Sequence, residues 1–157
     1  MKQILSTAAK IQMKKILLIL IASLSISLNA QNWVRPVEII AYHVLTVGVG
    51  AVGDALYDEG NKESGHALKA AEVGMLIGGP FIFHVQRSEA INYLLSYGFI
   101  RFSLFDSFYN MTRDLPLLYN GTTSGYDKFM SQIPPHGRAW YKSCSLIVGF
   151  AIPIKEL

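Results

Sequence analysis

Cysteine and charge are the two things this 157-residue sequence has least of. The single cysteine, Cys144, cannot close a disulfide within the chain, which excludes a cystine-stabilised scaffold. It lies in an apolar run, so we expect it to be a small buried residue. Charged residues make up 16% of the chain and hydrophobic residues 51%, whereas an average soluble domain carries about 25% charged residues. This balance is not typical of a water-soluble domain.

Acidic residues are absent from the first 30 positions, which hold four lysines. Without that segment the chain has ten Lys and Arg against eleven Asp and Glu. The excess of positive charge therefore belongs to the N-terminus alone. We expect no nucleic-acid partner, because a basic surface that could bind phosphates does not extend over the rest of the chain.

The N-terminus has the parts of an export signal. Two lysines precede the apolar stretch 16–28, and a small residue, Ala30, follows it. The sequence thus predicts a signal peptide over residues 1–30, and a start at Met13 would make 1–12 an upstream extension. The alternative is an uncleaved first membrane helix, although three serines dilute the apolar stretch.

Four further apolar segments follow, each about 16 to 21 residues long: 37–57, 67–85, 90–109 and 139–154. A helix needs about 20 apolar residues to cross a bilayer. Sustained period-two alternation, which a transmembrane strand requires, is absent from the sequence. We therefore expect an all-α fold, a small bundle of about four membrane-spanning helices. Residues 31–157 would form a single helical membrane domain, with one long connection at 110–138.

Several charges lie inside these segments, and each is costly at the bilayer centre. The segments are therefore either spans whose charges face the bundle interior or helices of an apolar soluble domain, and we favour the spans. Four crossings from an outside N-terminus place the first and third connections in the cytoplasm. They carry four cations against three on the outer side, which leans toward the positive-inside arrangement. This predicts a multi-pass protein of a bacterial inner membrane.

The stretch GVGAVGD, residues 48–54, spells the glycine pattern of a dinucleotide-binding loop. Such a loop needs a following helix and then a second strand that ends in an acidic residue about 20 residues on. The acid near that distance, Glu72, lies in a stretch rich in helix formers. The second strand is missing, so the pattern does not indicate a nucleotide site.

In a membrane helix, small residues allow two backbones to approach closely. We expect segments 37–57 and 67–85 to pack against each other through such residues. The same glycines could also mediate contacts between chains in a homo-oligomer. The alternative is that membrane helices simply tolerate glycine. The glycines concerned are Gly50, Gly53, Gly74 and Gly78.

Polar side chains form a stripe along two of the segments when residues are placed at about 100° intervals. We call these the polar stripes: His43, Asp54 and Asp58 on the first, and Asn92, Ser96, Ser103, Asp106 and Asn110 on the second. Arg101 points to the opposite side of its helix and needs a partner such as Glu72. The stripes either bond to each other across helices, since buried polar groups must be paired, or line a cavity for an ion, proton or head group.

A metal site within the first stripe is not expected. His43 and Asp54 share a face but lie about 16 Å apart along the axis, too far for one ion. Asp54 and Asp58 are one turn apart and would need a ligand from another helix. No other metal or nucleophile spacing occurs, so no metal and no cofactor is expected.

The long connection is a second candidate site. Hydroxyls flanked by cations can hold an anion such as a phosphate or lipid head group. The residues concerned are Arg113, Thr122, Thr123, Ser124 and Lys128. The alternative is an ordinary turn in which Thr123 or Ser124 caps a short helix through Phe129. Beyond it, the run Trp140 to Lys142 resembles an interface anchor.

These features favour a non-enzymatic binding or structural component of a membrane with a polar interior. A second hypothesis is a membrane-embedded enzyme or transporter that acts on a lipid head group or ion through Asp54, Asp106, Asn110 and Arg113. A third is a periplasmic soluble helical domain with an apolar partner. The lipid bilayer is the partner that the composition predicts most directly.

Overall fold

The computed structural model describes residues 34–121 and 125–154, and within these residues the chain is helical with no strands. The expected all-α fold is therefore confirmed. The predicted signal peptide at 1–30 and residues Thr122, Thr123 and Ser124 lie outside the described part. The helices are α2 (Val34–Asp58), α3 (Lys62–Ile82), α4 (Ala90–Thr112), α5 (Gly125–Ser131) and α6 (Pro135–Ile154).

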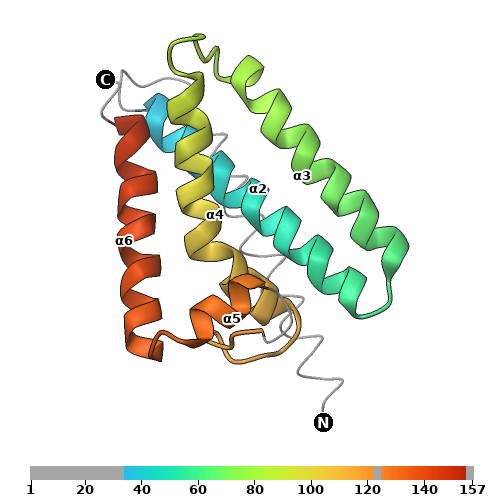
Figure 1. Cartoon of the computed structure of the whole chain (residues 1–157). Coiled ribbons are helices and arrows are strands. Elements are labelled where there is room, and N and C mark those ends of the chain that lie inside the picture. Colours follow the sequence, from blue (N-terminus) through green and yellow to red (C-terminus); the bar gives the residue numbers. More distant parts are fainter. Residues whose placement is uncertain (1–33, 122–124, 155–157) are drawn as a thin grey trace.

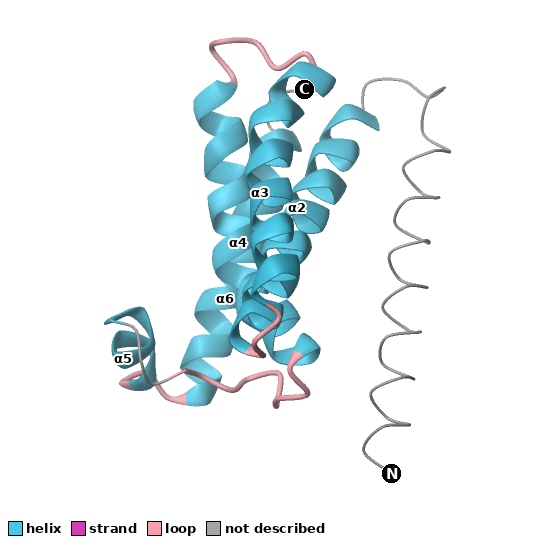
Figure 2. Ribbon diagram, turned by 90° about the vertical axis from the view of Figure 1, so that its right-hand side faces the viewer, coloured by secondary structure: helices cyan, strands magenta, loops and turns pink. Residues whose placement is uncertain are grey.

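The four long helices run up and down beside one another (Figure 1). α2 is central and packs against α3, α4 and α6, while α4 also packs against α6. The turn between α2 and α3 and the connection from α4 to α6 lie at one end of the bundle. The start of α2, the α3–α4 connection and the end of α6 lie at the other end. Seen from the side, the short α5 projects next to the lower end of α6 (Figure 2).

The turn from α2 to α3 follows directly from local sequence. Gly60 adopts a φ of 90°, the left-handed conformation that glycine tolerates best. The amides of Gly60 and Asn61 donate to the carbonyls of Tyr57 and Leu56, which is the Schellman pattern that ends a helix. The Asn61 side chain then accepts a hydrogen bond from the Ser64 amide and caps α3. α3 therefore begins at Lys62, five residues before the expected segment.

Glycines of α2 and α3 allow these helices to approach closely, as the sequence predicted. A Cβ on Gly53 would lie 3.2 Å from the Gly65 carbonyl oxygen, and one on Gly65 would lie 2.9 Å from the Gly53 carbonyl oxygen. The glycines used on α3 differ from those expected. Gly74 and Gly78 face open space, whereas Gly65 and Gly79 are buried.

The interior of the bundle is unusually polar for its size. Eight hydrophobic side chains in the described part are buried, and seven polar or charged ones are buried with them. The small apolar core consists of Val47, Tyr97 and Ile100. In contrast, twenty-two large hydrophobic side chains are exposed, including Phe81, Ile91 and Trp140, each at least 70% exposed. Within the described residues, buried polar side chains are thus almost as many as buried hydrophobic ones, and many large apolar side chains lie on the surface.

One sequence prediction about a single residue was wrong. Cys144 is exposed rather than buried, because it lies on the side of α6 away from the neighbouring helices. In the predicted interface anchor, Trp140 and Tyr141 are exposed, while the Lys142 ammonium pairs with Asp106 of α4 at 2.5 Å.

The expected number of membrane spans is not established by the helices themselves. Among the described helices only α2 is long and apolar enough to be a candidate span, with a mean hydropathy of 1.6, and 44% of its apolar window is buried. A core helix can pass the same test. What the structure supports is a helical bundle, and the spans remain a proposal.

We predict that Gly65→Ala lowers the melting temperature of the purified chain in detergent. The added Cβ would lie 2.8 Å from Tyr57 Cβ and 2.9 Å from a backbone oxygen, and overpacking of this kind costs about 1–3 kcal/mol. The matched control is Gly74→Ala on the same helix, where the Cβ meets nothing within 4 Å. That control gains helix propensity and should not lose stability. Equal melting temperatures for both variants would contradict close α2–α3 packing.

Candidate functional site: a buried polar network across the bundle

Glu72 of α3 is the centre of the polar interior. The residue is only 5% exposed. Its Oε1 accepts a hydrogen bond from the Tyr97 hydroxyl at 2.6 Å and also pairs with the Arg101 guanidinium, both from α4. Its Oε2 lies 3.4 Å from Lys69 Nζ. Arg101 thus has the partner that the sequence suggested for it.

Lys69 connects Glu72 to Asp54 of α2, because it forms an ion pair with each of them. Lys69 Nζ donates to Asp54 Oδ2 at 3.0 Å, so the charges alternate in sign from Asp54 through Lys69 and Glu72 to Arg101. We call these four residues with Tyr97 the Glu72 network. Two carboxylates face two cations within it, and this formal neutrality lowers the cost of placing charge inside an apolar bundle.

Gly50 explains the glycine-rich stretch GVGAVGD. A Cβ at Gly50 would lie 2.2 Å from the Glu72 carboxyl carbon, a distance that no real contact allows. The absence of a side chain at this position therefore makes the space in which the carboxylate lies against α2. The motif serves helix packing and the Glu72 network, in agreement with its rejection as a nucleotide loop.

A second cluster lies around His43 of α2, which is fully buried. The Ser96 hydroxyl donates to the Gly149 carbonyl oxygen of α6 at 2.8 Å, and His43 Nδ1 lies 3.2 Å from the same hydroxyl. Because the only hydroxyl proton is used on Gly149, Nδ1 is the donor to Ser96 and Nε2 carries the lone pair. The His43 ring also meets Tyr93 edge to face at 4.4 Å between centroids.

Two buried polar atoms of this cluster have no hydrogen-bond partner in the described part of the chain, His43 Nε2 and the Tyr93 hydroxyl. The Tyr93 hydroxyl occupies the space beside Gly79, where a Cβ would overlap it. Neither atom is reachable from outside, because His43 is 0% and Tyr93 4% exposed. The cluster therefore has no access for a substrate.

The two polar stripes meet in the interior, where His43 contacts Ser96. Asp58 of the first stripe accepts a hydrogen bond from Tyr109 at one end of the bundle, and Tyr109 is not a stripe residue. Asp54 instead pairs with α3, and Asp106 pairs with Lys142 of α6. Sequence periodicity predicts which face of its helix a residue occupies, but it does not predict which other helix packs against that face.

Of the remaining stripe residues, Asn110 holds one end of the bundle together. Asn110 is buried and donates to the carbonyl oxygens of Leu117 and Tyr119, which holds the connection after α4. Ser103 is buried, and Asn92 is partly buried beside Pro153 of α6. Within the described residues no group of three His, Cys, Asp or Glu side chains is placed to hold a metal ion.

The predicted anion-binding loop is only partly described. Arg113 donates to the Tyr109 hydroxyl at 2.6 Å, and Lys128 lies on α5. A helix does follow the predicted turn, since α5 begins at Gly125.

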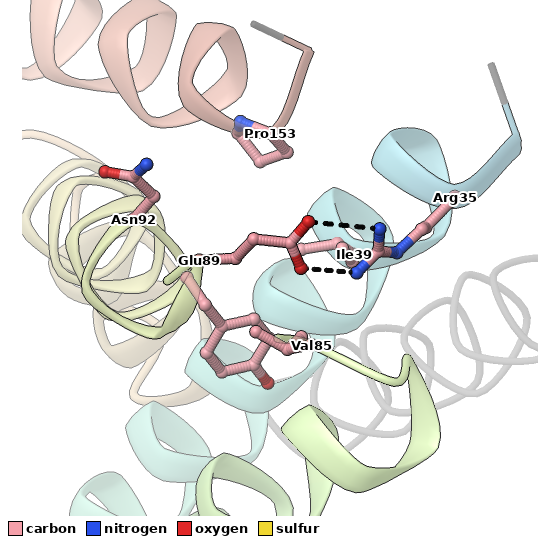
Figure 3. A pocket seen from close by; sticks show the side chains of 7 residues that line it. Arg35, Ile39, Val85, Glu89, Asn92 and Pro153 are labelled. Atoms are coloured by element: carbon pink, nitrogen blue, oxygen red, sulfur yellow. Dashed lines mark hydrogen bonds and ion pairs between the residues drawn. The ribbon is translucent and has the colours of Figure 1, made fainter. Parts of the chain in front are cut away.

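Two small hollows lie at opposite ends of the bundle. The first is lined by Arg35, Ile39, Val85, Glu89, Asn92, Tyr93 and Pro153 (Figure 3). In this hollow the Arg35 guanidinium donates two hydrogen bonds to the Glu89 carboxylate, at 2.7 Å to Oε2 and at 3.4 Å to Oε1. The second is lined by Leu118, Tyr119, Asn120, Pro135, Arg138 and Lys142. The sequence analysis missed the second hollow, because its walls come from two stretches that only folding brings together.

The pKa of Glu89 lies below its usual value, chiefly because the Arg35 side chain bonds to the carboxylate and also because the Gln86 amide does so. A depressed carboxyl pKa adds stability that is present above the ordinary Glu pKa and is lost as the pH falls through the folded-state pKa. This pair fixes the start of α4 against the start of α2.

We predict that Arg35→Gln lowers stability at neutral pH by less than about 1 kcal/mol, as for other partly exposed pairs. The difference from wild type should shrink as the pH falls through the depressed pKa of Glu89, because the carboxyl then becomes protonated in both proteins. Melting curves between pH 3 and pH 7 measure it, with Arg87→Gln in the neighbouring exposed loop as the control. A difference that does not change with pH would show that the carboxylate is not involved.

We also predict that Glu72→Gln destabilises the purified chain by about 3 kcal/mol. This is the lower end of the range for a broken buried ion pair, because Arg101 keeps part of its surface exposed. The double variant Glu72→Gln with Arg101→Gln should lose less than the sum of the single losses. Glu63→Gln, an exposed acid on the same helix, should cost less than about 1 kcal/mol. Additive losses in denaturation curves would contradict a coupled pair.

Comparison with known proteins adds no assignment to this geometry. No protein-family model matches the chain, and neither a curated protein nor a solved structure matches it. What the chain does must therefore be inferred from its own residues: a charge-balanced polar interior, an apolar exterior and two hollows at the ends of the bundle.

Proposed function

We propose that the protein is a multi-pass helical membrane protein that acts as a non-enzymatic structural or binding component. Its place would be a bacterial inner membrane, with the N-terminus of the mature chain outside. The observation that supports this best is the combination of a polar interior with an apolar surface. The Glu72 carboxylate and several hydroxyl groups are buried, while twenty-two large apolar side chains of the described residues are exposed.

The outer surface is better suited to hydrocarbon than to water. Apolar area exposed to water costs about 25 cal/mol for each Å², and monomeric soluble proteins rarely expose large contiguous apolar patches. On α3 the exposed side chains Val73, Ile77 and Phe81 follow one another at helical spacing on one face. A bilayer around the bundle would remove this cost.

Helix lengths are compatible with a bilayer. At 1.5 Å per residue, α2 spans about 37 Å and the 20-residue α6 about 30 Å. The hydrocarbon core of a bilayer is about 30 Å thick. The longer helices would reach into the head-group region, where Arg35 and Asp58 stand at the two ends of α2.

The polar interior supports a structural role rather than catalysis. The Glu72 carboxylate is buried and bonded to Tyr97, Arg101 and Lys69, so most of its acceptor positions are used within the bundle. Polar bonds between membrane helices contribute about 0.6 kcal/mol each on average. The Glu72 network joins α2, α3 and α4, and the His43 cluster joins α2, α4 and α6.

Extraction of membranes with alkaline carbonate tests the proposal. We expect the full chain to stay in the membrane pellet and to dissolve only with detergent. The control is a soluble periplasmic protein released from the same cells. Release of the chain into the supernatant would overturn the membrane assignment and favour a soluble helical domain with an apolar partner.

Reporter fusions supply the second measurement of the same proposal. A fusion near Asn120 should report the cytoplasm and one after Leu157 the outside, because α6 would cross the membrane between them. Both reporters on one side would contradict four crossings even if the chain stays in the pellet.

A further inference from the structure

The second hollow differs from the first in its charge. Arg138 takes part in no side-chain hydrogen bond and no ion pair within residues 34–121 and 125–154. Lys142 is paired with Asp106 at 2.5 Å. In the hollow of Figure 3, by contrast, Arg35 is already matched by Glu89. The hollow that contains Arg138 is therefore left with an uncompensated positive charge.

The local backbone increases this positive charge. Arg138 lies in the first turn of α6, which begins at Pro135 and has no acidic residue in that turn. The start of a helix is its positive end, so a cation there is unfavourable unless an anion is close. Asp106, which pairs with a cation of the hollow, is already bound by Lys142. An external anion would relieve this unfavourable placement.

The position of the hollow suggests where the anion comes from. Trp140 and Tyr141 follow Arg138 directly and are 72% and 61% exposed. Exposed Trp and Tyr are enriched at the level of the lipid head groups. Leu118 and Tyr119 also line the hollow and are exposed. The hollow thus combines a free cation with apolar walls at the depth where a head-group phosphate would lie.

We propose that this hollow, lined by Leu118, Tyr119, Asn120, Pro135, Arg138 and Lys142, binds the phosphate of an anionic phospholipid. Arg138 supplies the main contact, since a guanidinium matches a phosphate with two parallel hydrogen bonds. Lys142 adds positive charge while it holds Asp106. The acyl chains would follow the exposed apolar surface of α6. The inference rests on the proposed membrane location, and basic pockets between membrane helices on the cytoplasmic side are known binding places for anionic lipids.

The test uses the full chain purified in a neutral detergent. Phosphatidylglycerol, phosphatidylcholine and inorganic phosphate are each titrated, and bound lipid is counted by native mass spectrometry while the melting temperature is recorded. We expect phosphatidylglycerol to bind and stabilise the chain more than phosphatidylcholine does. Arg138→Gln should weaken its binding about tenfold, the loss expected for one charge-assisted contact.

Lys62→Gln is the matched control, because it removes an exposed cation at the start of α3, at the same end of the bundle and outside the hollow. It should bind phosphatidylglycerol like wild type. Unchanged binding in Arg138→Gln, or equal losses in both variants, would overturn the site. A melting temperature of Arg138→Gln close to wild type without lipid shows that the variant is folded.

The remaining outcomes separate the sources of the phosphate. If inorganic phosphate protects the chain as well as phosphatidylglycerol does, the site takes a free anion and the lipid assignment is wrong. Carbonate extraction reports on the membrane proposal alone. A chain that stays in the membrane but binds lipid independently of Arg138 would overturn this inference and leave the proposed function standing.

Discussion

The carboxylate of Glu72 imposes the constraint on which the arrangement of α2, α3 and α4 depends. A carboxylate buried among helices must be matched by charge and hydrogen bonds, because an unpaired ion in an apolar interior costs far more than a helix contact provides. Arg101 and Tyr97 match it from α4, and Lys69 matches it from its own helix. These partners fix the rotation of α4 relative to α3.

The same carboxylate requires Gly50 on α2, since any side chain there would occupy its place. Close approach of α2 and α3 at Gly53 and Gly65 brings the carboxylate within reach of that gap. The glycines and the buried charge are therefore two parts of one packing arrangement. On the other side of α2, His43 and Ser96 extend the polar contacts to the backbone of Gly149 in α6.

The proposed function rests on charge and on which polar groups remain available. Glu72 and its partners are bonded to one another, and the two buried atoms without a partner, His43 Nε2 and the Tyr93 hydroxyl, are enclosed. We therefore expect binding places on the outer surface and at the ends of the bundle. At one end Arg35 and Glu89 neutralise each other; at the other end Arg138 is not neutralised within the described residues. An apolar exterior next to an unmatched guanidinium is the combination that an anionic lipid would complement.

Local sequence determined much of this protein by itself: four long helices, the short helix α5, the turn at Gly60 and the pairing of Arg101 with Glu72 could be predicted from periodicity, capping residues and the need to match a buried charge. Only the tertiary structure decided which glycines of α3 meet α2, which helix pairs with Asp54 and Asp106, and that Cys144 faces outward. Helical periodicity fixes which face a side chain occupies, but the neighbour of that face depends on the rotation and order of helices. The hollow at Arg138 also depends on the tertiary structure. Its walls are separated in the sequence and come together only when the connection after α4 folds back onto α6.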